Sequence, residues 1–153
     1  MIIKAFAVRL RQVLLVPATL LAIGISINSS AIAQSRLYNP VALPATNEVL
    51  DTLSEKDIPT GEGGFARDYS VKFNQGDNVA IDLTSDNFDS IVVLMAPDGS
   101  MIAENDDGPD GSTNSLLFHR ITNTGTYIVR VRAFGETGGG DFKLKVTRLK
   151  PLQ

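Results

Sequence analysis

Residues 69–84 have the sequence YSVKFNQGDNVAIDLT, in which two alternating stretches flank a turn. In both stretches apolar residues occupy every second position and mostly polar residues fill the positions between them. This alternation predicts two half-buried β-strands, and the Asn-Gln-Gly-Asp segment between them predicts a tight turn. The positions expected to face the core are Tyr69, Val71, Phe73, Val79, Ile81 and Leu83.

The same pattern extends from this stretch in both directions. The segment SIVVLM at 90–95 is apolar on both faces, as a central strand would be. Ala-Pro-Asp-Gly at 96–99 then predicts a hairpin, because Pro presets φ and Gly accepts a left-handed backbone. No segment after residue 33 shows a sustained helical period. Further strands are expected at 47–54, 101–104, 115–121, 126–133 and 141–148, and the strand that contains Tyr69 is expected to cover 65–73.

Seven or eight short strands with turns between them predict an all-β fold. We expect an antiparallel β-sandwich of jelly-roll or Greek-key type, with a closed barrel as the alternative. The predicted domain covers residues 47–150, and residues 34–46 form an extended leader that contains Pro40 and Pro44.

The first 33 residues have the composition of an export signal. Basic residues at 4, 9 and 11 precede the apolar run VLLVPATLLAIGISI at 13–27, and Ala-Ile-Ala at 31–33 is a small-residue cleavage site. We expect residues 1–33 to be a signal peptide that is cleaved after Ala33. The apolar run is short for a spanning helix, so no stable membrane anchor is expected afterwards. The exported protein would be periplasmic or secreted.

The composition excludes several kinds of chemistry. The chain contains no cysteine, which rules out disulfides, thiol nucleophiles, thiolate metal sites and acylation as a lipoprotein. Three of the 14 basic residues and none of the 17 acidic residues lie in the predicted signal peptide, so the remainder carries a net charge of −6. Such a surface repels phosphate backbones, and we expect no nucleic-acid partner.

Several short motifs occur together in one order along the chain. Each is weak alone, but the ordered series resembles the bacterial pre-peptidase C-terminal domain family over about residues 49–149. The upstream Asp51-Thr52-Leu53-Ser54, with Asp57, also resembles the family's opening strand. The remaining motifs are VKFNQGDNVAIDLT at 71–84, Asn-Phe-Asp at 87–89, VLMAPDG at 93–99, Glu-Asn-Asp-Asp at 104–107 and GTYIVRV at 125–131.

The resemblance implies a jelly-roll β-sandwich of the kind appended to secreted proteases and other exported hydrolases, where it is often removed during maturation. Some relatives at the ends of collagenases bind calcium and matrix protein. This sequence departs from that context because residues 34–47 are too few to hold a peptidase domain, so a protease function is not inherited. Acids ahead of the first strand supply ligands in the calcium-binding relatives, and Glu48, Asp51, Glu55 and Asp57 lie nearby without a clear match.

The segment NDDGPDG at 105–111 is a candidate calcium site because it is dense in oxygen ligands. It does not match the EF-hand, since position three from Asp106 is Gly108 and position twelve is Leu117. The alternative is an ordinary solvated turn, which uses the same residue types. The candidate ligands are Asp106, Asp107 and Asp110, with Asp86, Asp89 and Glu104 as possible additions.

No catalytic set is evident, and we expect the protein not to be an enzyme. The single His119 alternates with apolar residues in a strand pattern, which favours a partly buried structural histidine over a triad member. No Gly-x-Ser-x-Gly segment is present. A minimal hydrolase built on Asp86 with Asp89, or on Asp106 with Asp107, is the weakest alternative, because a sugar cleft is usually lined by aromatic residues.

The leading hypothesis is therefore a secreted binding or accessory module, organised by calcium if the acidic loop binds it, that contacts an extracellular protein or polysaccharide. The alternative is a structural or chaperone-like envelope protein that assists a separate exported hydrolase. Four outward basic residues would form a stripe for an acidic ligand if their two strands pair: Arg130, Arg132, Lys143 and Lys145.

Overall fold

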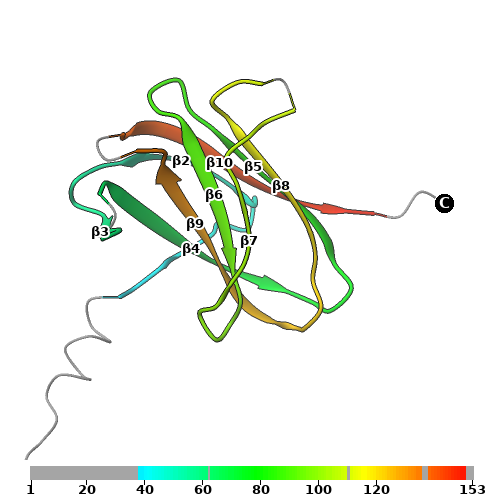
Figure 1. The fold of residues 1–153 in the computed structure, drawn as a ribbon. Coiled ribbons are helices and arrows are strands. Elements are labelled where there is room, and N and C mark those ends of the chain that lie inside the picture. The colour runs from blue at the N-terminus through cyan, green and yellow to red at the C-terminus, as the bar shows by residue number, and fades with distance from the viewer. Residues whose placement is uncertain (1–37, 62, 110, 136–137, 151–153) are drawn as a thin grey trace, which may run out of the picture. The chain divides into compact units, whose positions relative to one another are not determined.

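A computed structural model of the chain describes residues 38–61, 63–109, 111–135 and 138–150. Ten strands and no helix occur among these residues, and they pack as two sheets (Figure 1). No helix in the described ranges is therefore long and apolar enough to cross a membrane. The predicted signal peptide at 1–33 and the first four residues of the leader lie outside the described residues.

The first sheet has the strand order β1–β4–β9–β6–β7, with β3 beside β4. Only β1 pairs with its neighbour in parallel, and all the other pairs are antiparallel. Its strands are β1 (Val41–Ala42), β3 (Ile58–Pro59), β4 (Phe65–Phe73), β6 (Ser90–Met95), β7 (Met101–Asn105) and β9 (Gly125–Ala133).

The second sheet has the order β2–β10–β5–β8 and is wholly antiparallel. Neighbouring sequence strands β4 and β5 therefore lie in different sheets, although only a short turn joins them. The strands of this sheet are β2 (Glu48–Leu53), β5 (Asn78–Thr84), β8 (Ser115–Arg120) and β10 (Gly140–Leu149).

The eight longer strands are nested like one long hairpin that has been folded over. β6 pairs with β7, β5 with β8, β4 with β9 and β2 with β10. The two strands of each pair therefore lie, in sequence, on either side of the pair named before it. Pairing of β6 with β9 and of β5 with β10 then completes the two sheets. This connectivity is a jelly roll, and the predicted sandwich is confirmed.

The hairpin at the centre of this nesting forms where the sequence predicts it. Gly99 has a φ of 86°, and its amide donates to the carbonyl of Ala96 at 2.9 Å. The Asp98 carboxylate accepts a hydrogen bond from the Ser100 amide at 2.9 Å and another from its hydroxyl. These bonds lower the pKa of Asp98, with the Ser100 hydroxyl as the largest cause.

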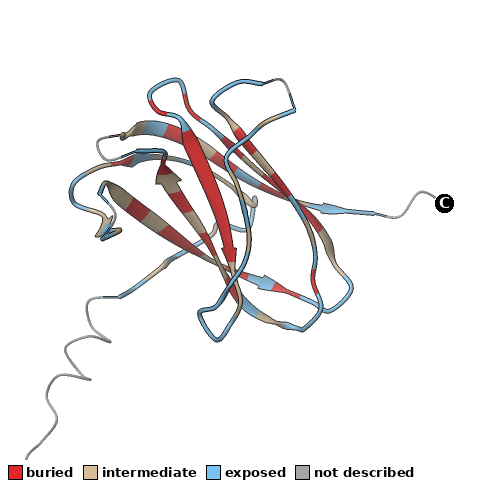
Figure 2. Ribbon diagram, in the orientation of Figure 1, coloured by how far each residue is buried: buried red, intermediate tan, exposed pale blue. Residues whose placement is uncertain are grey.

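The core lies between the two sheets and consists of the alternating residues that the sequence predicts (Figure 2). β6 is buried along almost its whole length, as expected for a central strand. Its outward residues Ile91 and Val93 lie opposite Arg132 and Arg130 on β9. Long arginine side chains cover apolar neighbours with their methylene groups while the charge stays in water. The fully buried core side chains include Tyr69, Phe73, Leu53, Ile81, Leu83, Leu94, Ile121 and Leu144.

Two short strands were not expected. β1 falls in the predicted leader and β3 falls between the predicted strands at 47–54 and 65–73, and both lie along the same edge of β4. Two residues are too few to show alternation, so the pairing depends on the neighbouring edge. Covering this edge of β4 leaves fewer free backbone groups for pairing with another chain.

Candidate functional site

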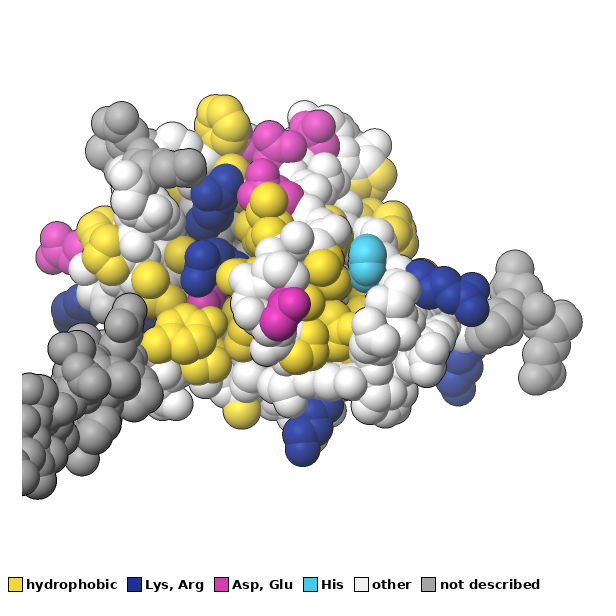
Figure 3. All heavy atoms as spheres, turned by 60° about the horizontal axis from the view of Figure 1, so that its bottom comes forward, with side chains coloured by type: hydrophobic (Ala, Val, Ile, Leu, Met, Phe, Trp, Pro, Cys, Tyr) yellow, Lys and Arg dark blue, Asp and Glu magenta, His cyan; other side chains and the backbone are white. Residues whose placement is uncertain are grey.

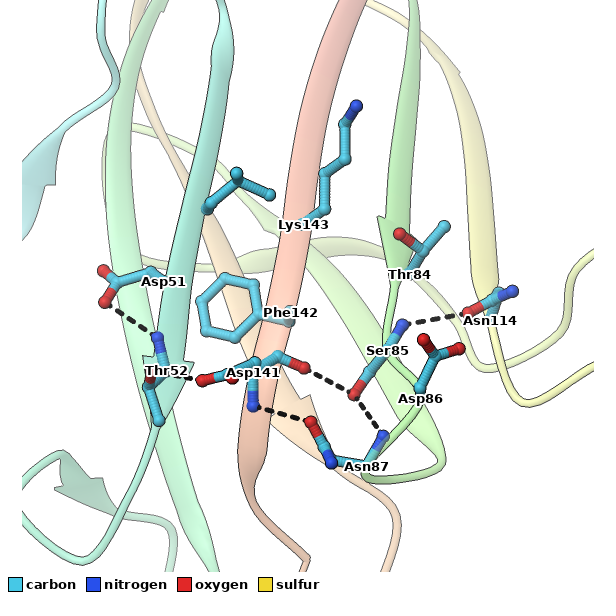
Figure 4. Close-up of a pocket in the computed structure, with 11 residues that line it drawn as sticks. Asp51, Thr52, Thr84, Ser85, Asp86, Asn87, Asn114, Asp141, Phe142 and Lys143 are labelled. Atoms are coloured by element: carbon cyan, nitrogen blue, oxygen red, sulfur yellow. Dashed lines mark hydrogen bonds between the residues drawn. The ribbon is translucent and has the colours of Figure 1, made fainter.

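An open groove of about 640 Å³ lies on the outer face of the second sheet (Figure 4). Its floor crosses three adjacent strands, because Lys143 on β10 lies opposite Leu50 on β2 and Thr84 on β5. All three residues occupy positions of their strands that face the solvent. Leu50 is apolar although it is 75% exposed, so one wall of the groove is apolar.

The loop after β5 closes one end of the groove. The buried Ser85 hydroxyl donates to the Asp141 carbonyl at 2.8 Å and accepts from the Asn87 amide at 3.0 Å. The Ser85 amide donates to Asn114 Oδ1 at 3.0 Å, and the Asp141 amide donates to Asn87 Oδ1 at 3.0 Å. These bonds tie the loop to β10 and to the segment before β8, which makes this end of the groove a fixed structure.

Gly140 allows this loop to approach the sheet. A Cβ atom at this position would lie 2.5 Å from Asn87 Cβ, and the φ of Gly140 is 133°. Both the close contact and the backbone conformation exclude larger residues. A glycine at the start of β10 is therefore required for the bond between Asn87 and the Asp141 amide.

Some charged groups of the groove have an ionic or hydrogen-bond partner, and others are left available. The Lys143 ammonium lies 2.8 Å from Glu48 Oε1, and this contact lowers the pKa of Glu48. Asp141 Oδ1 accepts a 2.6 Å hydrogen bond from the Thr52 hydroxyl. Asp86 is exposed and forms no hydrogen bond or ion pair with the residues that the structure describes. The Asp86 carboxylate and the second oxygen of Asp141 are thus available to a ligand.

Asp51 anchors the β2 side of the groove to the first sheet. Its carboxylate accepts from Arg67 at 2.5 Å and from the Tyr69 hydroxyl at 2.7 Å, and Arg67 also contacts Asp57. Burial alone would raise the pKa of Asp51, but the bonds from Tyr69, Thr52 and Arg67 together lower it. Burial and the adjacent carboxylate raise the pKa of Tyr69. Asp51 and Asp57 therefore both pair with Arg67, and the pair with Asp51 links the two sheets.

The comparisons with known proteins agree with the fold. The family model of the bacterial pre-peptidase C-terminal domain matches residues 66–133, which run from β4 to the end of β9. The chain contains a bacterial pre-peptidase C-terminal domain. The family predicted from the ordered motifs is confirmed. None of the curated proteins that were compared with the chain matches the chain.

Two solved structures are similar to this pre-peptidase C-terminal domain. The first is the pre-peptidase C-terminal domain of a collagenase from Bacillus anthracis, with a TM-score of 0.52 and 13% identity over 71% of this chain and 93% of that one. The second is PliG from Aeromonas hydrophila, a periplasmic inhibitor of g-type lysozyme, with a TM-score of 0.48 and 13% identity over 71% and 96% of the two chains. At such identity the collagenase domain shows a common fold only.

The predicted metal ligands are not gathered in the described part of the domain. Asp106 and Asp107 are exposed on the β7–β8 loop, while Asp110 lies outside the described residues. Glu104 pairs with Arg132 at 3.2 Å. Asp86 and Asp89 lie on the β5–β6 loop, where Asp86 faces the groove. Among the described residues no three His, Cys, Asp or Glu side chains form a metal-binding group, and calcium binding by the full loop stays a prediction.

The described part of the acidic loop has a structural role. Asn105 donates from its amide group to the Asp107 carbonyl at 2.7 Å and to the Leu116 carbonyl at 2.8 Å. The Leu116 amide donates to the same Asp107 carbonyl at 3.0 Å. The loop thereby satisfies backbone groups on the free edge of β8, the outer strand of the second sheet.

His119 and the four basic residues of the predicted stripe lie on three different strands, β8, β9 and β10. His119 lies opposite Val79 with intermediate exposure, as expected for a structural histidine. The predicted basic stripe is wrong, because β9 and β10 belong to different sheets. Arg130 forms two bonds of 2.7 and 2.8 Å to the buried Asp68, which also accepts from Tyr38. In the view of Figure 3 the basic side chains are scattered among hydrophobic and neutral ones.

Sequence reasoning found only part of the groove. It named Asp86 as a possible metal ligand and Lys143 as a member of the basic stripe, but it did not connect them. The break in alternation after Thr84 was the available signal, because a polar Ser-Asp-Asn segment at the end of a strand forms a capped turn. The neighbours of that turn come from β10 and from the segment before β8, which are distant in sequence.

Proposed function

We propose that the domain is an exported, non-catalytic binding module that contacts an extracellular or periplasmic protein through the groove on the second sheet. The observation that carries the proposal is the groove itself: a fixed loop, an exposed Leu50 and two available carboxylates stand on a rigid sandwich. Binding sites commonly combine a rigid scaffold with loop residues that keep unused polar groups.

The lining favours a protein ligand over a polysaccharide. Among the described residues that line the groove the only aromatic one is Phe142, which belongs to the core and is 3% exposed. A sugar chain would find no aromatic face on which to stack, whereas an apolar residue of a protein could pack on Leu50. The family supports a non-enzymatic role, because a pre-peptidase C-terminal domain accompanies a catalytic domain rather than providing one.

Site-specific photo-crosslinking tests the proposal. The full chain is expressed in a bacterial host with benzoylphenylalanine at position 50, or at position 101 as a control. Met101 is 63% exposed but lies on β7 of the other sheet. We expect one defined protein adduct at position 50 and none at position 101. Adducts only at position 101, or at neither position, would contradict binding through the groove.

The same preparation tests export. The first residue of the recovered protein is determined by mass spectrometry. Cleavage after Ala33 gives a chain that starts at Gln34. A cytoplasmic chain that retains Met1 would contradict the proposed localisation.

A further inference from the structure

The groove has an uneven charge that suggests what kind of protein segment it takes. The charged residues of its described lining are three aspartates and one lysine. Lys143 is engaged by Glu48, and Arg67 behind the groove is shared between Asp51 and Asp57. The lining and its direct ionic partners thus include two cations, Lys143 and Arg67, and four carboxylates, which are Glu48, Asp51, Asp86 and Asp141.

The excess negative charge lies where a ligand can reach it. Asp86 is exposed and unpaired among the described residues, and Asp141 is exposed with one oxygen held by Thr52. Figure 4 shows the Asp141 carboxylate near Thr52 and the Asp86 side chain on the other side of β10, so an elongated ligand that crosses β10 would pass both. Such a surface attracts cations and repels acidic ligands.

The neutral groups of the groove suit a polypeptide backbone. The Oδ1 atoms of Asn87 and Asn114 accept bonds from the Asp141 and Ser85 amides, which fixes both side-chain amides with their NH2 groups turned away from these bonds. Neither NH2 group has a hydrogen-bond partner in the described part of the chain. They are donors for the carbonyl groups of a peptide, while Leu50 offers an apolar contact.

We propose, building on the function above, that the groove selects an extended polypeptide segment that carries Lys or Arg. Asp86 and Asp141 bind the cationic side chains, the amides of Asn87 and Asn114 bind backbone carbonyls, and Leu50 packs against the methylene stems. The net charge of −6 outside the predicted signal peptide draws such a segment toward the domain over longer range.

The test uses synthetic decapeptides of alternating Gly-Lys, Gly-Arg or Gly-Gln, titrated into the exported chain and followed by NMR. We expect the two basic peptides to shift the amide signals of residues 84–87 and 141–143, and the Gly-Gln peptide to bind much more weakly. Exposed ion pairs contribute little individually, so Asp86→Asn and Asp141→Asn should each weaken binding by about two- to fivefold. Higher salt should weaken it further.

Asp98→Asn is the matched control, because it removes one charge from the β6–β7 hairpin of the other sheet and keeps the oxygen that accepts from Ser100. Three results would overturn the proposal: an equal loss of affinity in this control, signal shifts spread over acids outside the groove, or equal binding of the Gly-Gln peptide. If crosslinking at position 50 succeeds while the peptide test fails, the binding function stands and only the preference for a basic segment falls.

Discussion

The hydrogen bond from Tyr69 to Asp51 offers the sharpest test of how the two sheets are held together. Tyr69→Phe removes one hydroxyl from a fully buried side chain and leaves the ring packing in place. A hydrogen bond to a charged group contributes about 1.5–3 kcal/mol. The Asp51 side chain is 27% exposed, so the lower end applies, about 1.5 kcal/mol. For a domain near 100 residues this corresponds to a fall in Tm of about 6 °C.

Tyr127→Phe is the matched control. The Tyr127 hydroxyl donates at 2.7 Å to the neutral carbonyl of Asn123, and the residue is equally buried. Removing this hydrogen bond should lower the free energy of unfolding by about 1 kcal/mol, and this loss should not change as the pH falls. Urea unfolding at pH 7 should therefore rank Tyr69→Phe as the more destabilised variant.

The stability of the two variants at low pH decides whether the charge on Asp51 strengthens the bond from Tyr69. The lowered pKa of Asp51 stabilises the fold at pH above its ordinary value of 3.8, and this stabilisation is lost as pH falls through the lower folded value. Tyr69→Phe removes one of the bonds that lower this pKa, so its excess cost over Tyr127→Phe should shrink as pH approaches 2. An excess that is absent at pH 7, or that persists unchanged in acid, would show that the Asp51 contact contributes no charge-assisted stability.

Three further outcomes are expected. Leu53→Ala should lower the free energy of unfolding by about 2–5 kcal/mol because Leu53 is 1% exposed, whereas Leu50→Ala should change it by less than about 0.5 kcal/mol, as chemical denaturation would measure. Gly125→Ala should destabilise by about 1–3 kcal/mol because its Cβ would lie 2.5 Å from Pro97 Cγ, and an unchanged Tm would show that the hairpin shifts freely. The predicted calcium site is tested by thermal unfolding in calcium and in EDTA: a metal bound only by the native state at 100 times its Kd adds about 2.7 kcal/mol, and no difference would assign the loop aspartates to turn formation.

The sequence predicts the strands well because their signals are local. Alternation along residues 78–84 and 126–133 identifies strands that the structure places at Asn78–Thr84 and Gly125–Ala133. The hairpin at Pro97-Asp98-Gly99 forms because a turn of this kind depends only on its own residues. The ordered motifs also identify the family correctly.

Pairing between distant strands could not be derived in this way. The basic residues of β9 and β10 alternate in the manner expected for one shared face, yet the strands lie in opposite sheets. An alternating strand shows which side faces the core, but it carries no information about which strand lies beside it. The expected stripe was wrong for this reason, and Arg130 serves the buried Asp68 instead.

The sequence by itself determined the all-β class, the positions of the eight longer strands and the central hairpin, because alternation and turn chemistry act within about ten residues. Its ordered motifs also identified the family. The tertiary structure alone decided the nesting of the strands and the groove, where Leu50, Asp86 and Lys143 meet from three separate segments. The physical reason is that burying the apolar faces of eight strands fixes one packing of the whole chain. Contacts on the outer faces follow from that packing and produce no periodic pattern in the sequence.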